Sequence, residues 1–201
     1  MLKKKILIIN NGLEGGGIER ASVSMANHFV LLGYKIIVVA LYKSEHFFTL
    51  DKRISHIEPH FRREFVIRSI YVLKMMIFLR KTIKRNKPDV ILAFNEWTNP
   101  FVVFATLGLH TSLFLSDRMS PVLALTPIHH FLKKTLYKKA QGIIAQTNLA
   151  KDIIHSLTGA SNIKVIYNPV NCINKINCDS KNRIVTVGRL SKEKGHRFLI
   201  E

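Results

Sequence analysis

Short apolar runs alternate along the chain with longer segments in which apolar residues recur every three or four positions. The short runs carry almost no charge, which is typical of strands buried on both faces of a sheet. They predict strands at residues 5–9, 35–41, 89–94, 112–116, 142–147, 164–167 and 183–187, and a half-exposed strand at 53–58. The longer segments predict helices at 18–33, 66–86, 98–109, 121–140 and 149–157. This alternation predicts an α/β fold, a Rossmann-like parallel sheet with helices on both faces.

One polar stretch, residues 168–182, interrupts this rhythm. It is rich in Asn and has no hydrophobic periodicity, so we interpret residues 171–182 as a linker. Residues 1–170 then form one domain, and residues 183–201 are the first strand and helix start of a second domain, truncated at that point. Cys172 and Cys178 lie in the linker at a spacing that fits neither a zinc motif nor a redox CxxC, which predicts free thiols in a reducing compartment.

The charge of the chain is strongly positive. Thirty-one Lys and Arg against thirteen Asp and Glu give a net charge of +18. Such a charge favours nucleic acid, phosphorylated small molecules or an acidic membrane as partner. We find no nucleic-acid-binding module. No apolar run approaches the roughly 20 residues of a membrane-spanning helix, and the first one is too short for a secretory signal. We therefore expect a cytoplasmic protein with, at most, peripheral membrane contact.

The predicted helix at 66–86 combines cationic and apolar positions. At about 100° per residue, Lys74, Lys81 and Arg85 share one stripe, with Lys84 beside it, and the apolar residues occupy the other side. Such a helix can lie on anionic lipid through these cations. The alternative is an ordinary solvated face above a stripe that packs in the core.

Two glycine-containing turns are candidate phosphate sites. In the stretch NNGLEGGGIER, residues 10–20, the glycines Gly15, Gly16 and Gly17 precede a predicted helix whose N-terminus favours anions. Arg20 stands where a dinucleotide motif has its third glycine, and no GK[ST] of a P-loop follows. After the strand at 183–187, Arg189 and Lys194 flank a turn and suit a diphosphate. Plain turns remain the alternative at both places.

Four segments, in the expected order, resemble GT-B glycosyltransferases of the retaining family 4 type, and together they extend over essentially the whole chain. The first is GGGIER with the following helix and strand, and the second is IKRNKPDVILAF. The third is KVIYNPVN, with Pro169 in place of the usual glycine. The last, VGRLSKEKGHRFLIE, resembles the opening of the family's second domain.

The resemblance implies roles for individual residues. The first domain would bind the acceptor and the second a nucleotide-sugar, with no metal cofactor. Gly16, Gly17, Arg189 and Lys194 would bind donor phosphates. Asp117 and Arg118 stand near the place of a histidine that many members have, and we assign them as candidate catalytic residues. Arg118 would hold an acceptor phosphate and Asp117 would fix Arg118 or orient a hydroxyl, a structural ion pair being the alternative. Further acceptor contacts would come from Gly15, Glu19 and Asn95, although Asn95 could instead cap a helix.

The implied activity is sugar transfer from a nucleotide-sugar to a glycan or polyprenyl-linked acceptor in cell-surface polysaccharide synthesis, at the inner face of the cytoplasmic membrane. The family's acidic pair, E-x7-E, would lie beyond residue 201. We therefore expect an incomplete donor site and little or no transfer by this chain without a separate C-terminal half. The alternative is a non-catalytic domain that binds an anionic lipid or a protein partner. A nicotinamide oxidoreductase is disfavoured, because Leu41 and Tyr42 stand where its acidic residue would be.

Overall fold

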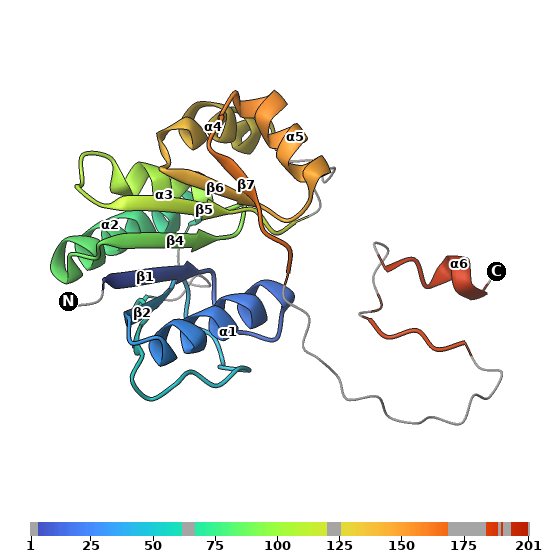
Figure 1. The fold of residues 1–201 in the computed structure, drawn as a ribbon, viewed down its shortest axis with the longest axis horizontal. Coiled ribbons are helices and arrows are strands. Elements are labelled where there is room, and N and C mark those ends of the chain that lie inside the picture. Colours follow the sequence, from blue (N-terminus) through green and yellow to red (C-terminus); the bar gives the residue numbers. More distant parts are fainter. Residues whose placement is uncertain are drawn as a thin grey trace. The chain divides into compact units, whose positions relative to one another are not determined.

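The structure is a computed structural model that describes residues 4–61, 67–119, 126–168, 184–188, 190 and 194–200. The chain separates into two compact units, Met1–Pro169 and Val170–Glu201. Figure 1 shows both units, and each is described by itself.

The larger unit is built on a seven-stranded sheet with the order β3-β2-β1-β4-β5-β6-β7. Every pair of neighbouring strands is parallel. All carboxyl ends therefore lie at one edge, and the order reverses between β1 and β4, where such sheets bind ligands. The strands are β1 (Lys5–Asn10), β2 (Lys35–Ala40), β3 (Ser55–Ile57), β4 (Val90–Phe94), β5 (Ser112–Ser116), β6 (Gly142–Ala145) and β7 (Ile163–Val165).

Helices cover both faces of this sheet, which confirms the predicted fold class (Figure 1). On one face, Val23, Ala26 and Val30 of α1 pack against the strands. On the other face, α2, α3 and α5 contribute to a second and larger core. The helices are α1 (Gly17–Leu31), α2 (Arg68–Asn86), α3 (Asn99–Thr106), α4 (Pro127–Leu136) and α5 (Asn148–Thr158), with a short 3-10 turn, η2 (Tyr137–Lys139), after α4.

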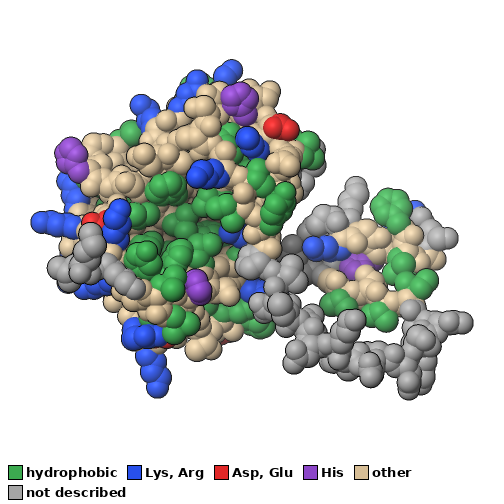
Figure 2. All heavy atoms as spheres, viewed as in Figure 1, with side chains coloured by type: hydrophobic (Ala, Val, Ile, Leu, Met, Phe, Trp, Pro, Cys, Tyr) green, Lys and Arg blue, Asp and Glu red, His purple; other side chains and the backbone are tan. Residues whose placement is uncertain are grey.

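The face that carries α1 is only partly covered. All helical members of its core come from α1, so Phe114 of β5 and Ile144 of β6 are only half buried on this side. Figure 2 shows hydrophobic side chains gathered in the middle of the larger unit, with Lys and Arg mostly around its edge.

Local sequence signals explain where the helices begin and end. The Thr147 side chain accepts a hydrogen bond from the Ala150 N–H at the start of α5, and Gly159 ends that helix at φ 64°. The Thr126 side chain caps α4, whose first residue is Pro127. The predicted start of this helix, at residue 121, falls outside the described residues. Lys87 ends α2 with a φ of 45°, directly before Pro88.

Helix α2 has the orientation that its pattern predicts. Lys74, Lys81, Lys84 and Arg85 are exposed, and the helix's inward face is apolar. The same outward face also carries Ile70, Leu73 and Ile77, between 46% and 57% exposed, which the sequence analysis did not single out. No helix in the described parts of the chain is long and apolar enough to cross a membrane.

In the smaller unit, the predicted strand at 183–187 is wrong for the residues that can be checked. Residues 184–187 have no strand structure, and Ile184, Val185 and Val187 are at least 77% exposed. A strand needs a neighbour for its backbone hydrogen bonds, and no described strand pairs with this segment. The described regular element here is α6 (Arg197–Ile200). The predicted linker, 171–182, lies outside the described residues.

Candidate active site

Polar residues gather where β4 and β5 end. The two strands are neighbours whose last residues, Phe94 and Ser116, pair in register. The residues that follow them, Asn95 and Asp117, therefore emerge side by side at the carboxyl edge of the sheet. The Asn95 N–H donates to the Ser116 carbonyl over 3.3 Å, which continues the pairing one step further.

Asp117 is the centre of a buried hydrogen-bond network. It is 5% exposed, and its Oδ2 accepts from Lys133 Nζ at 2.5 Å. Its Oδ1 accepts from the Tyr137 hydroxyl at 2.8 Å and from Asn99 Nδ2 at 3.1 Å. Burial and the charge of Asp117 hold the pKa of the Tyr137 hydroxyl above its usual value, so this group stays a donor.

This network is a structural ion pair, the alternative that the sequence left open for Asp117. Its cation, however, is Lys133 of α4, where the sequence analysis named Arg118. Both carboxylate oxygens are engaged inside the protein, so Asp117 ties α3, α4 and η2 to the end of β5. A direct catalytic role for Asp117 stays a prediction, and these contacts do not favour it.

Arg118 points to a different set of partners. Its Nε donates to Ser116 Oγ at 3.1 Å, and its Nη1 donates to Asn168 Oδ1. The guanidinium carbon lies 4.9 Å from the centre of the Phe94 ring, within cation–π range. The pKa of the Arg118 guanidinium is lowered by burial, and the nearby charge of Glu96 offsets only part of this effect. Within the described residues Arg118 forms no ion pair with a carboxylate, so it is a half-buried, oriented cation suited to an anionic ligand.

Asn168 is a site residue that sequence reasoning missed, although it lies in the segment KVIYNPVN. Its Oδ1 also accepts from Gln146 Nε2 at 2.8 Å. This amide therefore joins the ends of β5, β6 and β7 around Arg118. The signal available in the sequence was its place just after a strand, at the same edge as Arg118.

Glu96 is the second residue that was missed. It is 6% exposed, its Oε1 accepts from the Met119 N–H at 2.7 Å, and its Oε2 is buried with no hydrogen-bond partner among the described residues. Burial, with a smaller contribution from the charge of Asp117, raises the pKa of Glu96 to about 7. A carboxyl group that titrates there can exchange a proton with a hydroxyl at neutral pH. The signal was an acidic residue directly behind Asn95, after an apolar strand.

Asn95 holds the turn that leads into α3. Its φ is 119°, in the region that non-glycine residues seldom adopt, and its Oδ1 accepts from the Trp97 N–H at 2.9 Å. The residue at the cap of α3 is Thr98, so Asn95 does not cap the helix, and its side chain instead closes a turn over residues 95–97, before the helix begins. Strained backbone of this kind is concentrated at functional sites.

The Gly-rich loop lies at the same edge, after β1. Gly16 precedes α1 as its cap, and Gly17 is the first helical residue. A Cβ at Gly16 would lie 2.2 Å from Glu19 Oε2, whereas one at Gly17 would meet nothing within 4 Å. Glu19 therefore folds back over the helix start, and its burial raises the pKa of its carboxyl. The Phe47 ring would lie 3.2 Å from a Cβ at Gly15. Of the three glycines, Gly17 has the open space that a ligand requires.

The other predicted phosphate ligands belong to the smaller unit. Arg189 lies outside the described residues. Lys194 is described, and its Cγ would lie 3.7 Å from a Cβ at Gly188, so these two residues lie close to each other. Gly195, at φ 65°, follows it with a backbone that favours glycine.

Comparison with known proteins decides the family. The sequence model of Glycosyltransferase Family 4 matches residues 15–173, most of the chain. The chain belongs to glycosyltransferase family 4. The match includes the three glycines Gly15, Gly16 and Gly17, and also Asn95, Asp117, Arg118 and Asn168.

One curated relative of this family 4 chain comes from Campylobacter jejuni. It is GalNAc-alpha-(1->4)-GalNAc-alpha-(1->3)-diNAcBac-PP-undecaprenol alpha-1,4-N-acetyl-D-galactosaminyltransferase. The two are 26% identical over 197 residues, which cover 94% of this chain and 54% of the relative. The family 4 chain therefore spans about half the length of that enzyme.

Solved structures support the fold. The lipopolysaccharide outer core galactosyltransferase WaaB has a TM-score of 0.64 at 18% identity, over 83% of this chain and 46% of that one. UDP-GlcNAc 2-epimerase from Methanocaldococcus jannaschii has a TM-score of 0.57 at 15% identity, over 82% of this chain and 45% of the epimerase chain. Transferases and an epimerase share this architecture, so the fold alone does not assign the reaction of the family 4 chain.

Proposed function

We propose that this chain is the acceptor-binding half of a retaining glycosyltransferase. The enzyme would transfer a sugar from a nucleotide-sugar to a polyprenyl-diphosphate-linked glycan during cell-surface polysaccharide synthesis. The observation that carries the proposal is Arg118, an oriented cation at the carboxyl edge of the sheet that forms no ion pair with any carboxylate in the described parts of the chain. Family membership and the undecaprenyl-diphosphate acceptor named for the Campylobacter relative support it.

The proposed chemistry is mainly electrostatic. Arg118 would bind the acceptor diphosphate, and Ser116 and Asn168 would keep its guanidinium in place. Gly17 would let the start of α1 approach the donor phosphates, and Arg189 and Lys194 would neutralise the diphosphate as it leaves. Neutralising charge that develops in the transition state lowers the barrier directly. We propose no metal ion at the reacting bond.

The outer surface of α2–α4 supports peripheral contact with a membrane. The first half of the outward face of α2 carries apolar side chains together with Lys74, and the second half carries Lys and Arg. Helix α2 contacts α3, which contacts α4, and both neighbours also expose large apolar groups. An apolar surface beside cations is the pattern of helices that lie in a lipid interface. The exposed apolar residues are Ile67, Ile70, Leu73, Ile77, Phe104, Leu107, Ile128 and Phe131.

Binding of the acceptor tests the proposal directly. We expect the purified chain to bind nanodiscs that contain an undecaprenyl-diphosphate-linked disaccharide more tightly than nanodiscs of the same lipids without it. Arg118→Ala should reduce this preference about tenfold or more, since charge-assisted hydrogen bonds contribute about 1.5–3 kcal/mol. Arg53→Ala is the matched control, because Arg53 is an exposed arginine paired with Asp51.

Three results would contradict the proposal. If nanodiscs with and without the glycolipid bind equally, the chain binds lipid and not an acceptor, which is the alternative that the exposed surface of α2 favours. If Arg53→Ala lowers the preference as much as Arg118→Ala does, general positive charge explains it. Incubation of the chain with UDP-sugars and this acceptor should give no product, and product would contradict the proposal that the chain acts as an acceptor-binding half.

A further inference from the structure

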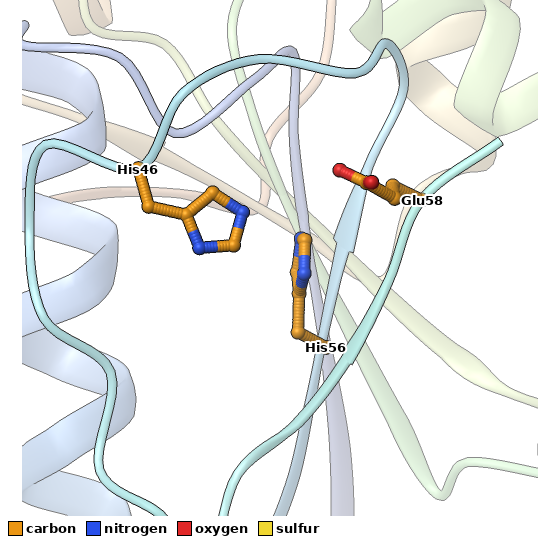
Figure 3. A group of neighbouring side chains, drawn as sticks. All are labelled: His46, His56 and Glu58. Carbon is orange, nitrogen blue, oxygen red and sulfur yellow. The ribbon is translucent and has the colours of Figure 1, made fainter.

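Two histidines and a glutamate meet beside the sheet edge formed by β2 and β3. His46 comes from the loop after β2, His56 from β3, and Glu58 from the residues just after β3. Figure 3 shows the three side chains directed toward a common space. The ligand atoms of the three all lie within 4.8 Å of one another, and the two imidazole centroids are 4.6 Å apart. None of the three residues belongs to the candidate active site.

We propose that His46, His56 and Glu58 bind a divalent transition-metal ion, with Zn²⁺ as the best fit. Two imidazole nitrogens and one carboxylate form a borderline ligand set that suits zinc and its neighbours better than Mg²⁺ or Ca²⁺. Three protein ligands leave a fourth position for water. This is the only group of three such residues that the described parts of the chain bring together.

His56 supplies the observation that points to a ligand. Its Nε2 is buried and has no hydrogen-bond partner among the described residues. A buried polar atom without a partner costs free energy, so such atoms are uncommon in folded proteins. A metal ion bound at this nitrogen would satisfy it, and His46 and Glu58 lie where the remaining ligands are required.

The distances between the three ligand atoms require only a small movement of the side chains for a metal ion to bind. Zinc bonds of about 2.0–2.2 Å to nitrogen and oxygen place tetrahedral ligand atoms roughly 3.4 Å apart. The three groups must therefore draw together by about 1 Å or less each. His56 is held by strand pairing, whereas His46 is exposed in a loop and can make this movement.

Lys43 competes for the same carboxylate. Its Nζ lies 3.7 Å from Glu58 Oε1, and its side chain is 57% exposed. An exposed ion pair of this kind is weak and can be displaced by a metal ion. Removal of the Lys43 charge should therefore strengthen metal binding, an effect that a purely structural contact between the three side chains would not produce.

The position of His46 connects the site to the Gly-rich loop. The Leu13 N–H donates to Ser44 Oγ at 2.8 Å, and the Phe47 N–H donates to the Leu13 carbonyl at 2.9 Å. His46 lies between Ser44 and Phe47, so a metal ion at His46 would fasten β3 to the segment that holds the Gly-rich loop. The ion would act as a clamp. That role rests on the proposed function, whereas metal binding itself does not.

The test is metal titration of the full chain after treatment with EDTA. We expect one Zn²⁺ per chain by calorimetry, and visible absorption bands of four- or five-coordinate Co²⁺. His56→Ala and Glu58→Gln should each weaken binding by about tenfold to 100-fold or more, since even outer groups at metal sites have effects of that size. Lys43→Gln should strengthen binding about two- to fivefold, and His130→Ala, at an exposed histidine of α4, should leave it unchanged.

Three outcomes would overturn the proposal. The first is no stoichiometric Zn²⁺ binding by the unaltered chain. The second is equal loss of binding in His130→Ala and in His56→Ala. The third is full binding in Glu58→Gln, because the carboxylate would then not be a ligand. Acceptor binding in nanodiscs, measured on the metal-free chain, tests the function proposed above separately. Loss of acceptor binding would leave the metal site untouched, and loss of metal binding would leave acceptor binding untouched.

Discussion

Two carboxyl groups lie buried at the carboxyl edge of the sheet, and they differ in their partners. Asp117 has a cation and two further donors, whereas the hydrogen bond found for the Glu96 carboxylate comes from one backbone N–H, and Glu96 forms no salt bridge among the described residues. Charged groups inside proteins are stabilised by such partners, and without them they take up a proton. Glu96, whose pKa is raised to about 7, is therefore the group of this edge that we expect to respond to pH.

Glu96 should make the stability of the protein depend on pH. Its pKa is raised to about 7, so between about pH 4.5 and 7 the folded chain holds a proton that the unfolded chain has lost. The free energy of unfolding should fall as pH rises through this window, by up to about 1.4 kcal/mol per pH unit, and stay at the lower value above it. Glu96→Gln keeps the acceptor for the Met119 N–H and should remove this dependence, which urea unfolding at pH 5, 6, 7 and 8 would measure.

Glu45→Gln is the matched control for this experiment, because Glu45 is an exposed residue. It should keep the pH dependence of the unaltered chain. Unfolding free energies of Glu96→Gln that fall with pH as steeply as those of the unaltered chain would show that Glu96 is not the responsible group.

The sequence predicted which residues lie at this edge of the sheet, but not which side chains they contact. The place of Asn95, Asp117 and Arg118 follows from their positions after apolar strands, because parallel strands end together. The partners do not follow, since the side chain that reaches Asp117 comes from Lys133 on α4, 16 residues further along the chain. Glu96 escaped notice because burial, which makes it unusual, is a property of the folded chain.

At the scale of elements, the spacing of apolar residues was enough to predict helices and strands wherever a segment packs against the sheet. The inward face of α2 was predicted correctly because its apolar residues recur with the helical repeat. Its outward face was described only by its cations, since Leu73 and Ile77 also fit an apolar core position in a linear pattern. The structure separates them, because Met75, Leu79 and Ile83 are buried and these two are not.

The apolar residues on the outward face of α2 should contribute to lipid binding. Leu73→Ser combined with Ile77→Ser should reduce flotation with anionic liposomes about five- to tenfold or more, because partial burial of two large side chains contributes on the order of 1 kcal/mol each. Lys81→Gln with Lys84→Gln should have a similar effect at low salt, at about 1 kcal/mol per cation, and no effect with neutral lipid.

Leu31→Ser on α1 is the control for that pair, since Leu31 is 70% exposed on a helix that packs on the opposite face of the sheet. If Leu31→Ser lowers flotation as strongly as the α2 variants do, α2 is not a specific contact. Equal flotation with anionic and neutral liposomes would remove the role assigned to the cations.

At the scale of the whole molecule, the apolar core that the described residues form lies in the larger unit. Every member of the two core clusters falls between Ile6 and Ile163. The described large apolar residues of the smaller unit are exposed, from Leu199 at 48% to Val187 at 94%. Local pattern made residues 183–187 resemble a strand, but a strand is stable only beside others, and the sequence pattern carries no information about whether they are present.

Removal of residues 170–201 should therefore leave the larger unit folded. Because burial of apolar area is the main source of stability, residues 1–169 should unfold within a few degrees of the full chain in a thermal scan, and with the same urea midpoint. The urea m-value should be nearly unchanged, since it follows the surface exposed on unfolding. A large fall in the midpoint would contradict the division at Pro169, because it would mean that residues 170–201 stabilise the core. A matched truncation at residue 158, which deletes β7 and with it Ile163, should destabilise the unit strongly, so the pair of truncations locates the end of the folded domain.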